Sequence, residues 1–265
     1  MITVWVEGVG IAGPGLNGWA ASKGVLTGLV PYRPAPFEPP PVTLLPPAER
    51  RRAGVAIRLA IGVGDEALRQ AGREPRTMPM VFASSGGDGQ TVHDILTALA
   101  TETREVSPTR FHNSVHNAPA GYWAVATGSC EPSTSLCAFD ASFSAGLWDA
   151  AAQVAVDGGP VTLVAYDLPY PEPLRTVRPI EGLFGMALVL APMPGDRAIA
   201  RLTIAPGHAG MGATSMADSD LERLRLGNPA ARGLPLLTAL AVGGSGTVCL
   251  DGASGAAAEI RIEPE

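Results

Sequence analysis

The sequence is poor in charge and in cysteine, and it has no excess of basic residues. Charged residues make up 17% of its 265 residues, and 19 Lys and Arg stand against 25 Asp and Glu, which gives a formal net charge of -6. Without a basic surface, we expect neither nucleic acid nor an anionic membrane as a partner. The three cysteines, Cys130, Cys137 and Cys249, form no CxxC pair. This scarcity argues against a structural zinc site and fits a reduced, cytoplasmic protein.

Long apolar runs are also missing. No stretch of 18 apolar residues exists, so no segment is expected to span a membrane. The N-terminal stretch MITVWVEGVG has no basic residue ahead of its apolar run, so we expect no signal peptide. The sequence is instead 46% hydrophobic, which is enough for a chain of this length to bury a sizeable core. No linker divides it, and residues 1–265 are expected to form a single domain.

The order of the apolar segments predicts an α/β fold. Short runs rich in β-branched residues alternate with segments whose apolar residues recur at helical spacing. Such alternation favours a substantially parallel sheet flanked by helices. The expected strands are 2–10, 79–85, 160–167, 182–192, 199–205, 246–252 and 257–263. The expected helices are 47–72, 90–100, the second part of 106–128, 142–156 and 234–242.

Proline and glycine mark the less regular parts. Residues 32–47 contain too many prolines for a helix or a central strand, so we expect them to lie extended over the surface. Residues 47–72 have a proline entry and a glycine stop, and they are expected to form one long helix, loosened at Gly62 and Gly64. Residues 206–228 are expected to form a polar loop.

Gly8, Gly10 and Gly13 match the GxGxxG pattern of dinucleotide-binding sites. That pattern requires a helix that begins at the glycines and an acidic residue about 20 positions later. The sequence continues instead as PGLNGWAASKG, which is typical of turns, and then enters the proline-rich stretch. We therefore expect no dinucleotide and no other cofactor, and the glycines are better explained as a tight exit from the strand.

His112 and His116 are four residues apart, as two metal ligands on one helix face would be. Prolines bracket the pair, and no carboxylate or cysteine stands nearby at ligand spacing, so we expect no metal. The two histidines, with Asn113 and Asn117, are better explained by hydrogen bonds within a loop or at an interface.

Ser142 begins the segment SFSAG, which approaches the GxSxG motif of hydrolases but lacks its first glycine. We expect Ser142 to cap the helix that follows. Cys137 stands just before this helix, where the helix dipole and free N–H groups favour a reactive thiolate. The residues alone leave open whether Cys137 is a nucleophile.

Taken in order, these segments resemble the β-ketoacyl synthase branch of the thiolase-like superfamily. The stretch ITVWVEGVGIAGPGLNGW resembles the first strand and glycine loop of those enzymes, and RRAGVAIRLAIGVGDEALRQAG resembles their first long helix. SPTRFHNSVHNAPAGYWAVATG is similar to the segment that builds much of their dimer interface. TSLCAFDASFSAGLWDAAAQVAVDGGPVTLVAYD resembles the active-site turn, the buried helix and the next strand, and EGLFGMALVLAP resembles the strand that closes the first half.

The resemblance covers residues 1–192 and implies a thiolase-like half fold, with a mixed sheet flanked by helices. Residues 193–265 would then be a short, divergent and truncated second half. The segments FHNSVHNAPAGYW and FDASFSAGL are most similar to those of short chain-length factors. Such proteins are associated with aryl-polyene and related type II fatty-acid or polyketide systems.

Synthases use a cysteine at the helix-entry turn and two histidines from the second half to condense an acyl thioester with a malonyl thioester. This chain has one histidine after Cys137, His208, and no segment similar to GTGT or NSFGFGG. Alignment on Gly146 places Ala138, not Cys137, at the nucleophile position. A cysteine one position off would point its sulfur into the packed interior. The resemblance therefore implies no catalytic residue in this chain.

The resemblance implies a non-catalytic, chain-length-factor-like subunit. Such a subunit pairs with an active β-ketoacyl synthase, meets the acyl carrier protein only indirectly and shapes the acyl pocket. Phe139 and Phe143 are the expected pocket residues, with Tyr122 and Trp123 as further candidates. The expected interface residues are Phe111, His112, Asn113, Val115, His116, Asn117, Tyr122 and Trp123.

Two alternatives remain open. The chain could be a self-sufficient acyltransferase or thioesterase that uses Cys137 with His112 or His116. It could also be a homodimeric scaffold or binding module without a synthase partner. For each aromatic residue taken singly, an ordinary place in the core is an equally good explanation.

Overall fold

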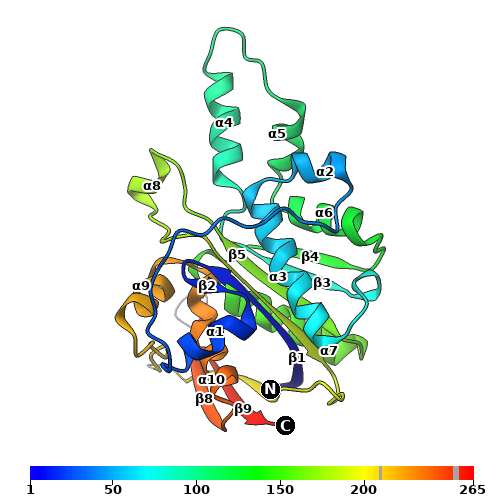
Figure 1. The fold of residues 1–265 in the computed structure, drawn as a ribbon, viewed down its shortest axis with the longest axis vertical. Helices are drawn as coiled ribbons and strands as arrows, with labels where there is room; N and C mark the ends of the chain where they lie inside the picture. Colours follow the sequence, from blue (N-terminus) through cyan, green and yellow to red (C-terminus); the bar gives the residue numbers. More distant parts are fainter. Residues whose placement is uncertain (209–210, 253–256) are drawn as a thin grey trace.

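The chain forms a mixed sheet with helices on both faces (Figure 1). The structure is a computed structural model that describes residues 1–208, 211–252 and 257–265. The strands follow the order β4-β3-β5-β6-β1-β7-β9-β8, and a short β2 pairs with the end of β1. The strand bounds are β1 Ile2–Gly13, β2 Leu16–Asn17, β3 Met80–Ala83, β4 Ser133–Leu136, β5 Val161–Asp167, β6 Phe184–Ala191, β7 Ala200–Pro206, β8 Gly246–Asp251 and β9 Ala257–Pro264. The helices are α1 Trp19–Leu26, α2 Pro47–Arg52, α3 Val55–Ala71, α4 Gly89–Leu99, α5 Pro108–Asn113, α6 Ala118–Thr127, α7 Ser142–Asp157, α8 Leu174–Val177, α9 Ser219–Gly227 and α10 Leu234–Val242, with 3-10 turns η1 Pro75–Thr77, η2 Phe139–Ala141 and η3 Ala230–Gly233.

Only one part of the sheet is parallel. β3 runs parallel to both β4 and β5, whereas all pairs from β5–β6 through β8–β9 are antiparallel. The predicted fold class, a mixed α/β sheet flanked by helices, is confirmed, but the expectation of a substantially parallel sheet is wrong. The connections from β5 to β6 and from β6 to β7 carry at most the single turn of α8. Antiparallel neighbours can be joined by such short connections, whereas parallel neighbours need a crossover.

The two faces of the sheet have separate cores. Successive residues of a strand point to opposite faces, so Leu163 of β5 packs on α7 with Phe143, while Val164 packs under α3 with Trp123. α3 and α6 cover one face, and α7 covers the other together with α1, η3 and α10. α4 and α5 stand out from the sheet, at the end of the molecule where α2 and α8 also lie (Figure 1).

Two glycines let β1 and α3 pack closely. A Cβ at Gly8 would overlap the carbonyl oxygen of Ala67, and one at Gly10 would overlap that of Val63. The helix therefore reaches the strand only because these positions lack side chains. The expectation that the glycines form a tight strand exit is wrong for Gly8 and Gly10, because β1 continues through both; it holds for Gly13, where β1 ends and a turn follows.

The expected long helix over 47–72 is two helices. α2 ends before an extended pair, Ala53 and Gly54, and α3 then continues without a break at Gly62 or Gly64. α2 buries no residue, whereas α3 buries ten. Apolar residues recur at helical spacing only from the start of α3 onward. Residues 47–52 have no buried side chain to hold them in line with α3, so α2 forms a separate helix.

The expected polar loop over 206–228 contains α9. The carboxylate of Asp218 caps this helix by accepting hydrogen bonds from the N–H groups of Asp220 and Leu221 at 2.9 and 3.1 Å. Leu221 and Leu224 are buried. Two apolar side chains and a good cap thus suffice for a helix in a polar stretch, and the loop prediction is wrong there; positions 209 and 210 lie outside the described residues.

Of the segment 32–47, expected to lie extended, residues 32–46, called the strap below, contain neither helix nor strand, as predicted, whereas Pro47 begins α2. It is held by hydrogen bonds from Tyr32 Oη to the Pro14 carbonyl at 2.7 Å and from Arg50 to the Thr43 carbonyl at 3.0 Å. In the described parts of the chain, no helix has the length and apolar character that crossing a membrane requires.

Candidate functional site at the turn between β4 and α7

The turn that joins β4 to α7 is strained at Phe139. Its φ is 54°, a left-handed conformation that residues with a side chain rarely adopt and that often marks a functional position. The Ala138 N–H donates to the Ser142 hydroxyl at 3.0 Å, and this hydroxyl donates to the Phe139 carbonyl at 2.7 Å. Ser142 therefore closes the turn ahead of α7 and does not cap the helix as predicted, because Ala141 occupies the N-cap position. A strained strand-to-helix turn that presents a side chain is the geometry of a nucleophile elbow.

The side chain presented at this elbow is a phenyl ring. Phe139 is 59% exposed, and the guanidinium of Arg178 lies over its ring at 3.5 Å. Arg178 also pairs with Asp140 at 2.8 Å. The sequence alignment places Ala138 at the nucleophile position, whereas the backbone gives the strained position to its neighbour Phe139. A phenyl ring cannot attack a thioester, so the residue at the strained position of this turn supplies no nucleophile.

Cys137 is exposed at the start of this turn. Its thiol donates a hydrogen bond to the Ser85 carbonyl, with sulfur and oxygen 3.1 Å apart. The expectation that a misaligned cysteine points its sulfur into the interior is wrong. Residue 137 follows the edge strand β4, so its side chain meets the loop after β3 and solvent.

The two expected histidine partners are engaged elsewhere. His116 Nε2 donates to the Ser84 carbonyl at 3.0 Å, and the His112 ring meets the Tyr122 ring edge-on with centroids 5.8 Å apart. One imidazole and the Cys137 thiol thus reach neighbouring carbonyls of the same loop, but no hydrogen bond joins either imidazole to the sulfur in the described structure. Within the described ranges, no three His, Cys, Asp or Glu side chains gather at metal-binding distance.

Asp167 ties this loop to the sheet. It ends β5 and is buried, and its Oδ1 accepts hydrogen bonds from Ser85 N at 2.8 Å, Ser85 Oγ at 2.7 Å and Ser84 Oγ at 3.2 Å. Burial raises the pKa of Asp167 to about 7, and the hydrogen bonds from Ser85 offset part of that effect. Because the carbonyls of Ser84 and Ser85 hold His116 and Cys137, one carboxyl positions both side chains. Asp167 is not among the residues expected from the sequence; its signal is an acid at the end of the apolar strand VTLVAYD.

An apolar groove of about 580 Å³, called the α4–α8 groove below, opens beside the turn. One wall is the loop after β3 with α4, and the other is the segment that leads into α8. The lining residues are Gly86, Gly89, Val92, His93, Leu96, Tyr170, Pro171, Pro173, Leu174 and Val177. Tyr170 packs against Gly86 and Gly89, where any Cβ would overlap its ring or hydroxyl.

The elbow contacts the base of both walls of this groove. Cys137 bonds to Ser85, one residue before the first wall, and Phe139 stacks on Arg178, one residue after the second. Phe143, the other expected pocket residue, is fully buried in the core instead. Phe139 and Phe143 therefore do not line a common surface in the isolated chain, and their role in an acyl pocket stays a prediction.

The expected interface residues fall into an exposed and a buried group. The exposed group is Phe111, His112, Val115 and Asn117; the buried group is Asn113, Tyr122 and Trp123, with His116 half-buried. Tyr122 Oη donates to Asn113 Oδ1 at 3.0 Å, and Asn113 Nδ2 donates to the Arg52 carbonyl at 2.8 Å. The buried group thus joins α2, α5 and α6, while the exposed group is available to another chain.

The sheet ends at β4, which pairs only with β3 in the described chain. The carbonyls of Pro132 and Leu136 accept hydrogen bonds from the β3 side. Since successive residues direct their N–H and C=O groups to alternate edges, Ser133 and Ser135 direct theirs away from β3. An uncharged edge of this kind is a template for pairing with a further strand.

The outer face of α6 lies next to this edge. Gly121, Ala124 and Val125 are exposed there, at helical spacing. Nothing lies within 4 Å of a Cβ built at Gly121. Small side chains on an exposed helix face allow a second backbone to approach closely.

Sequence comparison identifies one family. The pattern of the family described as "Beta-ketoacyl synthase, N-terminal domain" matches residues 27–226. The match extends past residue 192, where the expected resemblance ends. No curated protein matches the chain in sequence.

Several solved structures have a similar fold. A ketosynthase in complex with its chain length factor from Xenorhabdus doucetiae gives a TM-score of 0.75 at 21% identity, over 98% of this chain and 100% of that chain. A type II polyketide synthase acyl-carrier protein in complex with its ketosynthase, bound to the hexaketide, gives 0.74 at 12% identity, over 100% and 99%. The ishigamide ketosynthase/chain length factor gives 0.71 at 14% identity, also over 100% and 99%. The fold is therefore that of a thiolase-like ketosynthase half.

Proposed function

The chain belongs to the β-ketoacyl synthase N-terminal domain family, and from this premise we propose that it is a non-catalytic, chain-length-factor-like subunit. Its proposed partner is an active β-ketoacyl synthase of a type II fatty-acid or polyketide system, of the aryl-polyene kind. The chain would meet substrate only as an acyl chain carried by an acyl carrier protein. Two of the solved structures of similar fold are named as a ketosynthase with a chain length factor, which supports this choice of partner.

The observation that carries the proposal is the phenyl ring at the strained elbow. A covalent mechanism needs a nucleophile with a base in hydrogen-bond reach. Phe139 supplies no nucleophile, and the Cys137 thiol is bonded to a backbone carbonyl. His116 likewise donates its Nε2 proton to a carbonyl. The site keeps the geometry of a condensing enzyme without its chemistry.

The partner would bind a surface that we call the partner face. It consists of the free edge of β4, the outer face of α6 with Gly121 and Val125, Phe111 of α5, and Val115 in the turn between α5 and α6. Phe111 is 70% exposed and Val115 is 53% exposed. Burying such apolar side chains contributes about 1.5–3 kcal/mol each, and the β4 edge adds backbone hydrogen bonds that fix register.

The α4–α8 groove would become one wall of an acyl pocket when the synthase covers it. Its lining is almost entirely apolar, which suits a hydrocarbon chain. Phe139 does not line the groove in the isolated chain, but its ring stacks on Arg178, the residue after Val177 of the second wall. A bulky ring there would limit how far an acyl chain extends before elongation stops.

Co-expression with the synthase subunit of the same organism tests the proposal. A tag on this chain should retain the synthase, and mass measurement should give one copy of each. The pair should condense an acyl thioester with malonyl-loaded carrier protein, whereas this chain alone should not. Cys137→Ala should support the same product yield as the unaltered chain.

Three results would count against the proposal. Condensation by the chain alone would favour the enzyme hypothesis. A Cys137→Ala variant that abolishes product would show that the thiol is needed. A stable homodimer that never binds a synthase would favour the scaffold hypothesis.

A further inference from the structure

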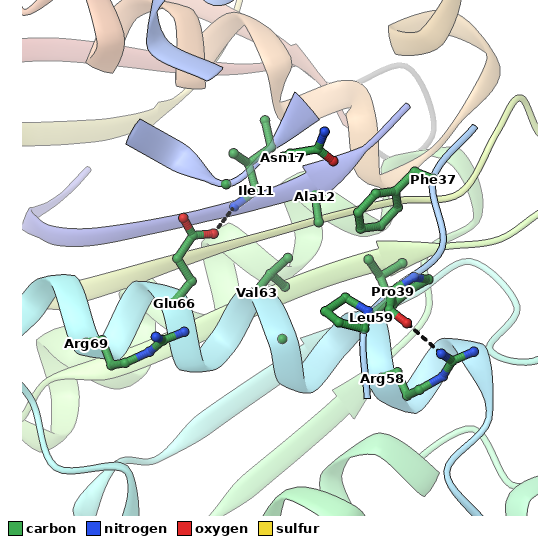
Figure 2. Close-up of a pocket in the computed structure, with 13 residues that line it drawn as sticks. Ile11, Ala12, Asn17, Phe37, Pro39, Arg58, Leu59, Val63, Glu66 and Arg69 are labelled. Carbon is green, nitrogen blue, oxygen red and sulfur yellow. Dashed lines mark hydrogen bonds between the residues drawn. The ribbon is translucent and has the colours of Figure 1, made fainter. Parts of the chain in front are cut away.

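A second hollow lies on the opposite face of the sheet from the elbow, and we call it the α3 hollow. It has a volume of about 450 Å³ and lies between α3, the end of β1 and the strap. Figure 2 shows Phe37 and Pro39 of the strap on one side, and Leu59 and Val63 of α3 facing them. The volume is in the range of sites for small ligands. It is separated from the partner face and from the α4–α8 groove, with which it shares no lining residue.

The floor of the α3 hollow is open because residue 62 is glycine. A glycine inside a helix costs about 1 kcal/mol relative to alanine, and such a cost usually has a packing reason. Gly64 has one, since a Cβ there would contact Val164 and Trp123. Gly62 has none, because nothing lies within 4 Å of its Cβ position. The missing side chain at Gly62, a lining residue, leaves space at the floor of the hollow.

One carboxylate, that of Glu66, lines the hollow without a cationic partner. Its Oε1 accepts a hydrogen bond from Trp19 N at 2.6 Å. Its Oε2 accepts one from Ile11 N at 3.0 Å, which Figure 2 shows as a dashed line. Burial raises the pKa of Glu66 above its ordinary value, and the two backbone hydrogen bonds oppose that effect. Each oxygen retains acceptor capacity for a further donor.

The neighbouring arginines pair with other carboxylates, and Arg69 acts on Glu66 only through its charge, which lowers the pKa of that carboxyl. Arg69 pairs with Asp65 at 2.9 Å, and Arg58 pairs with Glu38 at 3.0 Å and donates to the Pro39 carbonyl. In the described structure no ion pair to Glu66 is formed. Both guanidinium groups are therefore engaged, while the carboxylate faces an apolar hollow that a cation could enter.

We propose that the α3 hollow binds a small arylalkylamine, whose amino group is an ammonium ion at neutral pH. Its flat ring would lie against Phe37, Pro39 and the open floor at Gly62, and its ammonium group would donate to Glu66. The shape favours a flat apolar body, because rings of the strap form one wall and aliphatic side chains of α3 form the other. The charge favours an ammonium head, because Glu66 is the one lining carboxylate and the lining arginines are paired.

Tryptamine, titrated into the purified chain near neutral pH and followed by calorimetry, tests this proposal. We expect saturable binding to one site. Indole-3-propionate, which carries a carboxylate on the same ring, should not bind. Gly62→Leu fills the hollow and should abolish binding, whereas Gly121→Leu, a matched change at an open helical glycine on α6, should leave it unchanged.

Glu66→Gln removes the charge and should weaken tryptamine binding by about tenfold or more, the value of one charged hydrogen bond. Circular dichroism of each variant checks that it is folded. No saturable tryptamine binding by the unaltered chain, equal binding by Gly62→Leu, or equal binding of the carboxylate probe would overturn the proposal. If Glu66→Gln does not fold, the Gly62→Leu and Gly121→Leu pair still decides the outcome.

Discussion

Asp167 is a carboxyl group that the fold buries at the end of β5 to hold the loop after β3. Its Oδ1 accepts three hydrogen bonds, while its Oδ2 has no partner among the described residues. A buried carboxylate is costly when ionised. The pKa of Asp167, raised to about 7, places this cost in the physiological range. Protonation of Asp167 therefore affects the stability of the fold and also the loop whose Ser85 carbonyl holds Cys137.

Asp167→Asn should change how stability depends on pH. The folded state has a pKa of about 7 against an ordinary 3.8, so it binds the proton more tightly than the unfolded state does. The resulting stabilisation is complete below about pH 4 and is lost as the pH rises through about 7. The difference in unfolding free energy, Asn variant minus wild type, should thus grow with a slope of at most about 1.4 kcal/mol per pH unit and level off above pH 7. Urea unfolding at several pH values measures this, and parallel curves for the two proteins would contradict it.

Phe139→Cys should create a reactive thiol where the native chain has none. The strained turn exposes residue 139 at the start of α7, and a helix N-terminus favours a thiolate. Alkylation by iodoacetamide near neutral pH, followed by peptide mass mapping, should label the introduced thiol faster than native Cys137 in the same sample. Ala138→Cys is the matched control at the position that the sequence alignment selects. Faster labelling of the Ala138→Cys thiol would restore that alignment and reject the elbow at Phe139.

The difference between Ala138 and Phe139 shows the limit of sequence at the residue scale. The motif FDASFSAGL is enough to predict the turn and its helix. Which of two neighbouring residues takes the strained position depends on backbone angles, and these cannot be read from the sequence. Asp167 and Glu66 have the same limitation. Each acts on backbone groups at least 47 positions away, and such partners become known only when the sheet is assembled.

At the scale of elements, Gly10 of β1 and Gly62 of α3 differ in the space around them: a side chain at Gly10 would overlap α3, whereas one at Gly62 would meet nothing. Gly10→Ala should lower the free energy of unfolding by about 1–3 kcal/mol, because its methyl group would overlap the Val63 carbonyl and push the helix away. Gly62→Ala should raise it by about 0.5–1 kcal/mol, because alanine favours the helix and meets nothing. Denaturant titration of both variants measures these shifts. Equal effects at the two positions would show that close packing does not govern this contact.

Element boundaries follow the same division between local and long-range causes. The strap is predictable because its prolines exclude helix and strand locally. The break between α2 and α3 is not, since helix propensity continues through Arg50–Arg52 and only burial separates the two segments. The antiparallel pairing of the strands from β6 through β9 is equally unpredictable from the sequence, because the alternation of strands and helices does not determine which strands become neighbours.

At the scale of the whole molecule, two separate regions of the surface have different exposed features. The outer side of α3 and the end of β1 carry the strap and the α3 hollow, whereas the β4 end of the sheet carries the free edge, the outer face of α6, Phe111 of α5 and Val115 after it. Phe111, Val115 and Val125 are all more than half exposed. Apolar side chains gathered beside an unpaired edge are typical of a surface that another chain covers.

Variants on the partner face should separate pairing from folding. Gly121→Leu places a branched side chain where a second backbone would approach, and Ser135→Pro removes an N–H that the β4 edge directs outward. Both should reduce recovery of the synthase in co-purification, while Gly62→Leu, an equal change on α3 away from the β4 edge, should not. Thermal unfolding of each isolated variant should stay near that of wild type, because Gly121 has open space at its Cβ position and the Ser135 N–H points away from β3. If all three variants recover the synthase equally, the partner does not bind at the β4 edge, and the surface must be sought around α1, α10 and β8 at the far end of the sheet.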